Sequence, residues 1–81
     1  MKKHILKTHP EYFKEIILGN KKFEIRKNDR GFEVGDELIL KEYDPEYNQY
    51  TENEFSVLIT YILENAKDFG LMDGYCIISF I

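Results

Sequence analysis

The spacing of apolar residues changes once along this chain, and that change limits what the chain can fold into. Up to Gly19, a helix stop signal, four apolar residues recur at the spacing of one helical face: Tyr12, Phe13, Ile16 and Ile17. From Lys22 onward apolar and polar residues tend to alternate, which is the pattern of β-strands. The sequence therefore predicts one short helix near the start and a mostly β remainder.

The predicted elements follow from this pattern. Thr8, Pro10 and Glu11 form a helix-start signal, with Thr8 as the cap and Glu11 three residues later as in a capping box. We expect turns at 28–31 and 34–36, an exposed polar loop over Glu46–Glu54 and a short helical turn within Glu64–Phe69. The expected strands are Lys3–Lys7, one beginning at Lys22, Glu37–Tyr43, Phe55–Leu63 and Tyr75–Ile81.

The length sets the architecture. The 81 residues make a single domain, residues 1–81, and five short strands with one helix are too few for a two-sheet sandwich. Curling into a small barrel would remove the exposed sheet edges. We therefore predict a mostly β (α+β) fold, a small β-barrel with the main helix flanking or plugging one end.

The charge is unevenly distributed along the chain. The net charge is −4, yet residues 1–30 hold nine of the 11 Lys and Arg residues and carry a net +5, whereas residues 31–81 carry −9. This asymmetry indicates a partner with negative charge on one face. The alternative is that the two halves interleave in the fold and cancel.

Several other classes of protein are disfavoured. The single cysteine, Cys76, excludes an intrachain disulfide, and no apolar run reaches the ~20 residues that span a bilayer. No apolar segment of a signal peptide follows the basic start, so we expect a cytoplasmic location. His4 and His9 lack a spacing that would hold a metal, and we expect neither a metal nor a cofactor.

The segment Gly19–Arg30 is the densest in chemically active side chains. On one strand face Glu24 and Arg26 are two residues apart, and the planar fork of Arg26 suits phosphate or a base edge. The candidate binding residues are Lys7, Lys21, Glu24, Arg26 and Lys27. Spacing alone also allows a Glu24–Arg26 pair that only stabilises a half-exposed strand. Three tyrosines could stack on bases or hold a loop in place: Tyr43, Tyr47 and Tyr50.

The same segment carries a resemblance to a known family. Gly19-x-Lys21-x-x-Glu24-x-Arg26 is similar to the G-x-K-x-x-E-x-R signature of the ASCH family, which belongs to the PUA-like superfamily of small β-barrels. Other segments resemble one bacterial and phage branch of ASCH-like domains, so that the resemblance covers nearly the whole chain: His4–Pro10, Lys21–Arg30, Val34–Asp44, Thr60–Leu63 and Phe69–Tyr75.

The resemblance implies a function. PUA-like domains commonly bind RNA, and the ASCH signature is thought to line the cleft between barrel and helix. One ASCH branch removes the acyl group from N4-acylated cytidines with the signature Lys, a Thr at the place of Glu24 and a Glu before the last strand. Here Lys21 is kept, but Glu24 cannot act as a hydroxyl nucleophile, although it could act as a general base.

We therefore expect an RNA- or nucleotide-binding domain that uses a basic cleft, with Lys21 and Arg26 on phosphate and Glu24 accepting from a base or orienting Arg26. The alternative is a small hydrolase of a modified nucleoside, with Lys21 and Glu24 as the catalytic pair. A third hypothesis is an interaction module that uses its acidic second half.

Overall fold

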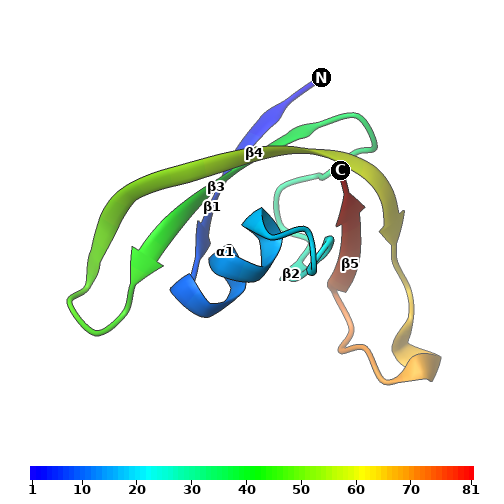
Figure 1. The fold of residues 1–81 in the computed structure, drawn as a ribbon. Helices are drawn as coiled ribbons and strands as arrows, with labels where there is room; N and C mark the ends of the chain where they lie inside the picture. Colours follow the sequence, from blue (N-terminus) through cyan, green and yellow to red (C-terminus); the bar gives the residue numbers. More distant parts are fainter.

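The computed structural model describes residues 1–81 and confirms a mostly β fold with one main helix (Figure 1). A short 3₁₀ turn, η1, lies within the predicted helical turn at Lys67–Phe69. The other elements are β1 (Lys3–Thr8), α1 (Pro10–Ile17), β2 (Phe23–Lys27), β3 (Glu37–Asp44), β4 (Gln49–Leu63) and β5 (Tyr75–Phe80).

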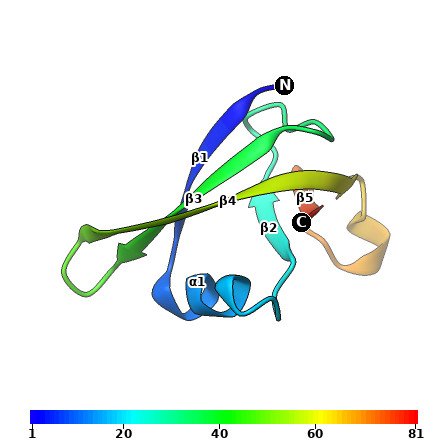
Figure 2. The same cartoon turned by 45° about the horizontal axis from the view of Figure 1, so that its top comes forward.

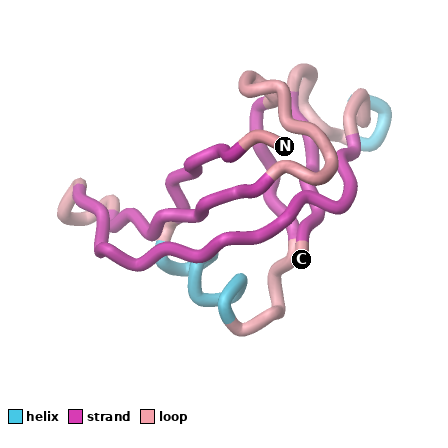
Figure 3. Tube along the Cα trace, turned by 90° about the horizontal axis from the view of Figure 1, so that it is seen from above, coloured by secondary structure: helices cyan, strands magenta, loops and turns pink.

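The five strands form one bent sheet in the order β1-β3-β4-β5-β2. Strand β1 runs parallel to β3, and every other neighbouring pair is antiparallel. The long strand β4 joins the two halves, since Gln49–Leu58 pairs with β3 and Ile59–Leu63 pairs with β5. Figures 1 and 2 show β4 arching over the molecule with α1 beneath the sheet, and Figure 3 shows the same sheet from above.

The sheet is open, so the predicted closed barrel is wrong. Strands β1 and β2 lie at its two ends and do not pair with each other. Side chains bridge this seam between β1 and β2 instead: Arg26 Nη2 donates to the Lys7 carbonyl at 2.6 Å, and Arg30 Nη1 donates to the Ile5 carbonyl at 2.6 Å. Paired strands must lie within about 4.8 Å of each other. Arg26 on β2 and Arg30 in the loop after β2 thus reach β1 through their side chains, in place of the backbone pairing that would close the barrel.

Two local predictions also need correction. The capping box at Thr8 does not form, because His9 is the N-cap, no side chain caps the helix and Thr8 Oγ1 makes no hydrogen bond. The loop predicted over Glu46–Glu54 is shorter, because β4 begins at Gln49 and pairs with β3 from there. A register shift beside Lys41 and a positive φ of 78° at Glu52 accompany this irregular pairing, which interrupts the alternation that marks a strand.

The core lies between the concave face of the sheet and α1. The helix contributes Phe13 and Ile16, and strand β3 contributes Leu38 and Leu40, which are fully buried. These side chains belong to one cluster of 11 buried residues that extends across both halves of the sheet. Because α1 is anchored on this core, its first turn is fixed beside the seam.

A buried hydrogen bond between His4 and Asp36 ties the start of β1 to the turn before β3. His4 Nε2 lies 2.9 Å from Asp36 Oδ2, and the backbone N–H groups of Lys2 and Glu33 donate to the same carboxylate. The hydrogen bond with His4, followed by the one from Lys2, lowers the pKa of Asp36 from 3.8 to about 2. Ionised Asp36 therefore stabilises the fold.

This pKa makes the domain sensitive to acid. Because the folded-state pKa lies below the unfolded value, the contribution of Asp36 is complete above about pH 4 and is lost as the pH falls toward 2. We expect the free energy of unfolding of Asp36→Asn to fall less steeply with decreasing pH over this range than that of the wild type. Urea denaturation at several pH values measures both slopes. Asp29→Asn, at an exposed turn position, is the matched control and should keep the wild-type slope. Equal slopes for all three proteins would contradict the assignment.

Candidate functional site

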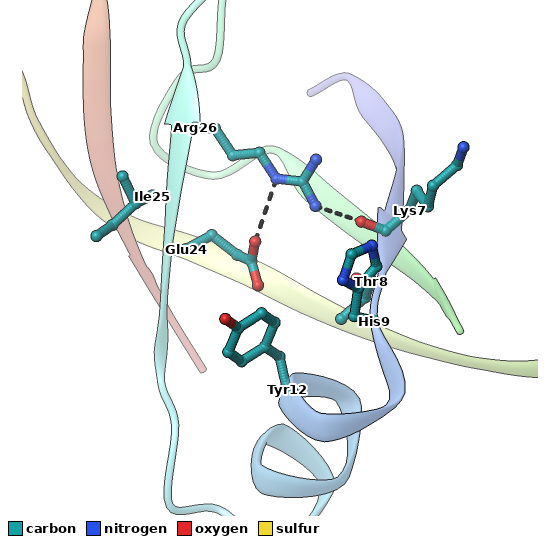
Figure 4. Close-up of a pocket in the computed structure, with 7 residues that line it drawn as sticks. All are labelled: Lys7, Thr8, His9, Tyr12, Glu24, Ile25 and Arg26. Atoms are coloured by element: carbon teal, nitrogen blue, oxygen red, sulfur yellow. Dashed lines mark hydrogen bonds and ion pairs between the residues drawn. The ribbon is translucent and has the colours of Figure 1, made fainter. Parts of the chain in front are cut away.

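A pocket of about 240 Å³ opens at the seam, between β1, β2 and the first turn of α1 (Figure 4). We call it the Arg26 pocket. It forms here because β1 leads directly into α1 while β2 faces both across the open edge of the sheet. Its lining residues are Lys7, Thr8, His9, Tyr12, Glu24, Ile25 and Arg26.

A buried carboxylate organises the site. Glu24 is 6% exposed, and each of its oxygens accepts a hydrogen bond from a different cation. Lys21 Nζ donates to Oε1 at 3.0 Å, and Arg26 Nε donates to Oε2 at 3.1 Å. A buried carboxylate requires such partners, and charge-assisted hydrogen bonds are the strongest that the protein can supply. Glu24 thus fixes both cations in one place.

Arg26 holds the pocket open across the seam. Its Nε is bound to Glu24, and its Nη2 donates to the Lys7 carbonyl on β1. These two contacts orient the guanidinium plane and leave the Nη1 amino group without a partner in the protein. In Figure 4 the guanidinium lies between Glu24 and Lys7, above the ring of Tyr12. A fixed guanidinium with free N–H groups is suited to phosphate or carboxylate.

A second pocket, of about 290 Å³, lies on the Lys21 side of Glu24. We call it the Lys21 pocket. Besides its bond to Glu24, Lys21 Nζ donates to the Phe23 carbonyl at 2.6 Å and lies 5.4 Å from the centroid of the Tyr12 ring. The residues that line this pocket are Tyr12, Lys21, Phe23, Glu24 and Ile25. Because Tyr12, Glu24 and Ile25 line both pockets, the two form one binding region around them.

One polar atom in the Arg26 pocket has no partner. Thr8 is 2% exposed, and its Oγ1 makes no hydrogen bond. Leaving a buried hydroxyl unsatisfied costs about 1–3 kcal/mol.

The net charge of the binding region is positive. Lys21 and Arg26 contribute two positive charges and Glu24 one negative charge, whereas the Lys7 ammonium lies outside the pocket over the Tyr43 ring. Two basic residues of the first segment, Lys21 and Arg26, thus meet at this site around one carboxylate. The region favours an anionic ligand over a cationic one.

Four of the five candidate residues meet here: Lys7, Lys21, Glu24 and Arg26. Lys27 is exposed at the end of β2 and lines neither pocket. Thr8, His9 and Tyr12 also line the Arg26 pocket but were not among the candidate binding residues. Tyr12 was assigned to the apolar helix face, but its side chain is 49% exposed and His9 stacks on it at 6.5 Å.

The cysteine and the three tyrosines of the sequence analysis line neither pocket. Cys76 is buried in β5, and that burial raises the pKa of its thiol. Tyr43 packs edge-on against Tyr50 at 5.1 Å across the β3–β4 hairpin, and Lys7 Nζ lies 4.0 Å from the centre of the Tyr43 ring. Tyr47 is exposed. No group of three or more His, Cys, Asp or Glu side chains has the geometry of a metal site.

Removing the charge of Glu24 tests its role in organising the site. We expect Glu24→Gln to lower the free energy of unfolding by about 1–3 kcal/mol, because Lys21 and Arg26 lose the counter-charge that holds them. Glu54→Gln makes the same change in the exposed Lys41–Glu54 pair and should cost less than about 0.5 kcal/mol. The measurement is urea denaturation at neutral pH. Similar losses in the two variants would contradict an organising role for Glu24.

None of the helices has the length and apolar character needed to span a bilayer.

Comparison with known proteins places the chain in a family. Over 40 residues the chain is 48% identical to the "uncharacterized 12.9 kDa protein in GpA 3′ region" of Escherichia phage P2, a match that covers 49% of this chain and 37% of the phage protein. The family model for a domain of unknown function, DUF3850, matches residues 3–80, nearly the whole chain. The chain therefore belongs to the DUF3850 family.

Proposed function

We propose that this DUF3850 domain binds RNA or a nucleotide-like ligand at the seam between β1 and β2. The observation that carries the proposal is the pair of cations, Lys21 and Arg26, held by the buried Glu24 beside the exposed ring of Tyr12. Fixed cations next to an aromatic ring match the two parts of a nucleotide, since the cations bind phosphate and the ring stacks on a base.

The proposed contacts follow from the free groups of the site. Arg26 Nη1 binds phosphate, and the Tyr12 ring stacks on the base. Glu24 has a structural part in this scheme, because it holds the guanidinium in a position that a mobile arginine would occupy only part of the time.

The proposal includes a relation to the ASCH family and the PUA-like superfamily. The three signature side chains, Lys21, Glu24 and Arg26, form one hydrogen-bonded chain in the pocket, which supports a shared binding function. The fold would be a PUA-like barrel that stays open at the seam. A cytoplasmic location, where RNA and nucleotides are available, is part of the same proposal.

Binding is favoured over hydrolysis by the residues that are missing from the site. No acid from the segment between β4 and β5 lines either pocket, and Glu64 instead accepts a hydrogen bond from Asn28. The region thus lacks a third group to complete a catalytic set with Lys21 and Glu24.

Salt dependence tests the phosphate contacts. We expect short single-stranded RNAs to bind weakly, with log affinity falling against log salt by about 0.7 for each phosphate contacted. Fluorescence anisotropy with a labelled hexanucleotide at several salt concentrations measures the slope. No binding at low salt, or binding that ignores salt, would contradict the proposal.

The Arg26 fork is tested by a substitution that keeps the charge. We expect Arg26→Lys to weaken RNA binding about tenfold while the domain stays folded by circular dichroism, because one ammonium cannot contact Glu24, the Lys7 carbonyl and a phosphate at once. Arg30→Lys is the matched control, since Arg30 also bridges to β1 but lines neither pocket. Binding that is unchanged in Arg26→Lys, or equally weakened in both variants, would remove Arg26 from the site.

A further inference from the structure

The acceptor capacity of Glu24 is only half used. An ionised carboxylate has about four positions that accept hydrogen bonds, and Glu24 receives one bond on each oxygen. The residue lines both the Arg26 pocket and the Lys21 pocket, so a ligand in either pocket reaches it. A ligand with two adjacent N–H donors in one plane could therefore bind both oxygens at once.

Lys21 supplies a hydrogen-bond donor beside the two acceptor oxygens of Glu24. Lys21 Nζ lies 3.0 Å from Glu24 Oε1, and two of its three protons are used, by Glu24 and by the Phe23 carbonyl. The third proton is available to a ligand. Along this side, the site offers a donor followed by two acceptors.

Guanine is the nucleobase with the matching edge. Its Watson–Crick edge presents the O6 acceptor, then the N1–H donor, then the N2 amino donor. Adenine and cytosine each place a ring-nitrogen acceptor beside a single amino donor, and uracil places its N3–H between two carbonyl oxygens. A ring nitrogen or carbonyl oxygen of the base that faces a carboxylate oxygen is repelled. Each of these bases therefore loses at least one contact that guanine makes.

The other parts of a guanine nucleotide also find partners. The Tyr12 ring, 49% exposed, lies beside Glu24 and can stack on the purine. Arg26 Nη1 remains for the phosphate. Each pocket, at 240 and 290 Å³, is slightly smaller than the usual range of about 300–1,000 Å³ for small-molecule sites. The two together suit one nucleotide rather than a longer stretch of chain.

We infer that the site is selective for guanine, read by Glu24 and Lys21, in a free guanine nucleotide or in one guanosine of a single-stranded RNA. The inference rests on the proposed function and adds base selectivity to it. Glu24 then has two parts: it positions Arg26 and contacts the base directly.

The sharpest test changes the ligand and leaves the protein intact. GMP, IMP and AMP differ only at the edge that Glu24 and Lys21 would contact, and IMP is GMP without the 2-amino group. Titration of the ¹⁵N-labelled domain by NMR measures millimolar and tighter affinities. We expect GMP to bind at least about tenfold more tightly than AMP and at least about fivefold more tightly than IMP, because each lost donor–acceptor pair lowers the affinity.

The protein-side variant is Glu24→Gln, which should reduce the preference for GMP over IMP to less than twofold, with Glu54→Gln keeping the wild-type ratio. The RNA arm compares U₆ with a hexamer in which one central U is replaced by G, and the G-containing RNA should bind more tightly.

The outcomes separate the two proposals. If RNA binds with the expected salt slope but GMP, IMP and AMP bind equally, the guanine inference is overturned and the proposed function stands. A preference for GMP that survives in Glu24→Gln would also overturn the inference, because another group would then read the base. If neither RNA nor any of the nucleotides binds, both proposals fail.

Discussion

The carboxylate of Glu24 is the group on which the rest of the site depends. It is buried at an edge of the sheet, where two cations satisfy it, and those cations are thereby fixed at the mouth of the seam. Without it, Lys21 and Arg26 would be mobile surface side chains whose positions vary. The carboxylate thus holds the positive charges of Lys21 and Arg26 at defined positions. Selective binding of an anion requires charges that are fixed in this way.

The open seam and the site have the same origin. A closed barrel would satisfy the edges of β1 and β2 with backbone hydrogen bonds and leave no room between them. Here the carbonyls of Lys7 and Ile5 accept from Arg26 and Arg30, so β1 and β2 are held near each other without pairing. The fold keeps an accessible gap lined by polar groups, and the core anchors α1 beside it. Arg26 therefore both bridges the seam and lines the Arg26 pocket.

Much of the fold was predictable because local patterns decide it. The alternation in β2 was read correctly, since Glu24 and Arg26 do share a face, and the helix and the later strands lie close to their expected positions. The sequence could not predict whether the barrel is open or closed, because closure depends on whether two edges far apart in the sequence meet. The start of β4 was missed because Gln49–Glu54 is polar and exposed on both faces. Only pairing with β3 marks it as a strand.

The site was predictable in part for a similar reason. Lys21, Glu24 and Arg26 are close in sequence, so their spacing indicates that they can meet. Lys7 joins them only because β1 lies across the seam. Thr8 and Tyr12 gave signals of other roles, a helix cap and a core residue, and tertiary placement overrides both. Lys27 was included for its charge, but it is exposed and lines neither pocket.

The central claim is that ligand binds at the seam, and mapping the binding surface tests it most directly. The measurement is the change in backbone amide chemical shifts when a short single-stranded RNA is added to the ¹⁵N-labelled domain. The account predicts that the largest changes fall at Thr8, Tyr12, Glu24 and Arg26, on three elements that meet only at this site. Changes concentrated on the β3–β4 hairpin, or on the outer face of β5, would contradict it.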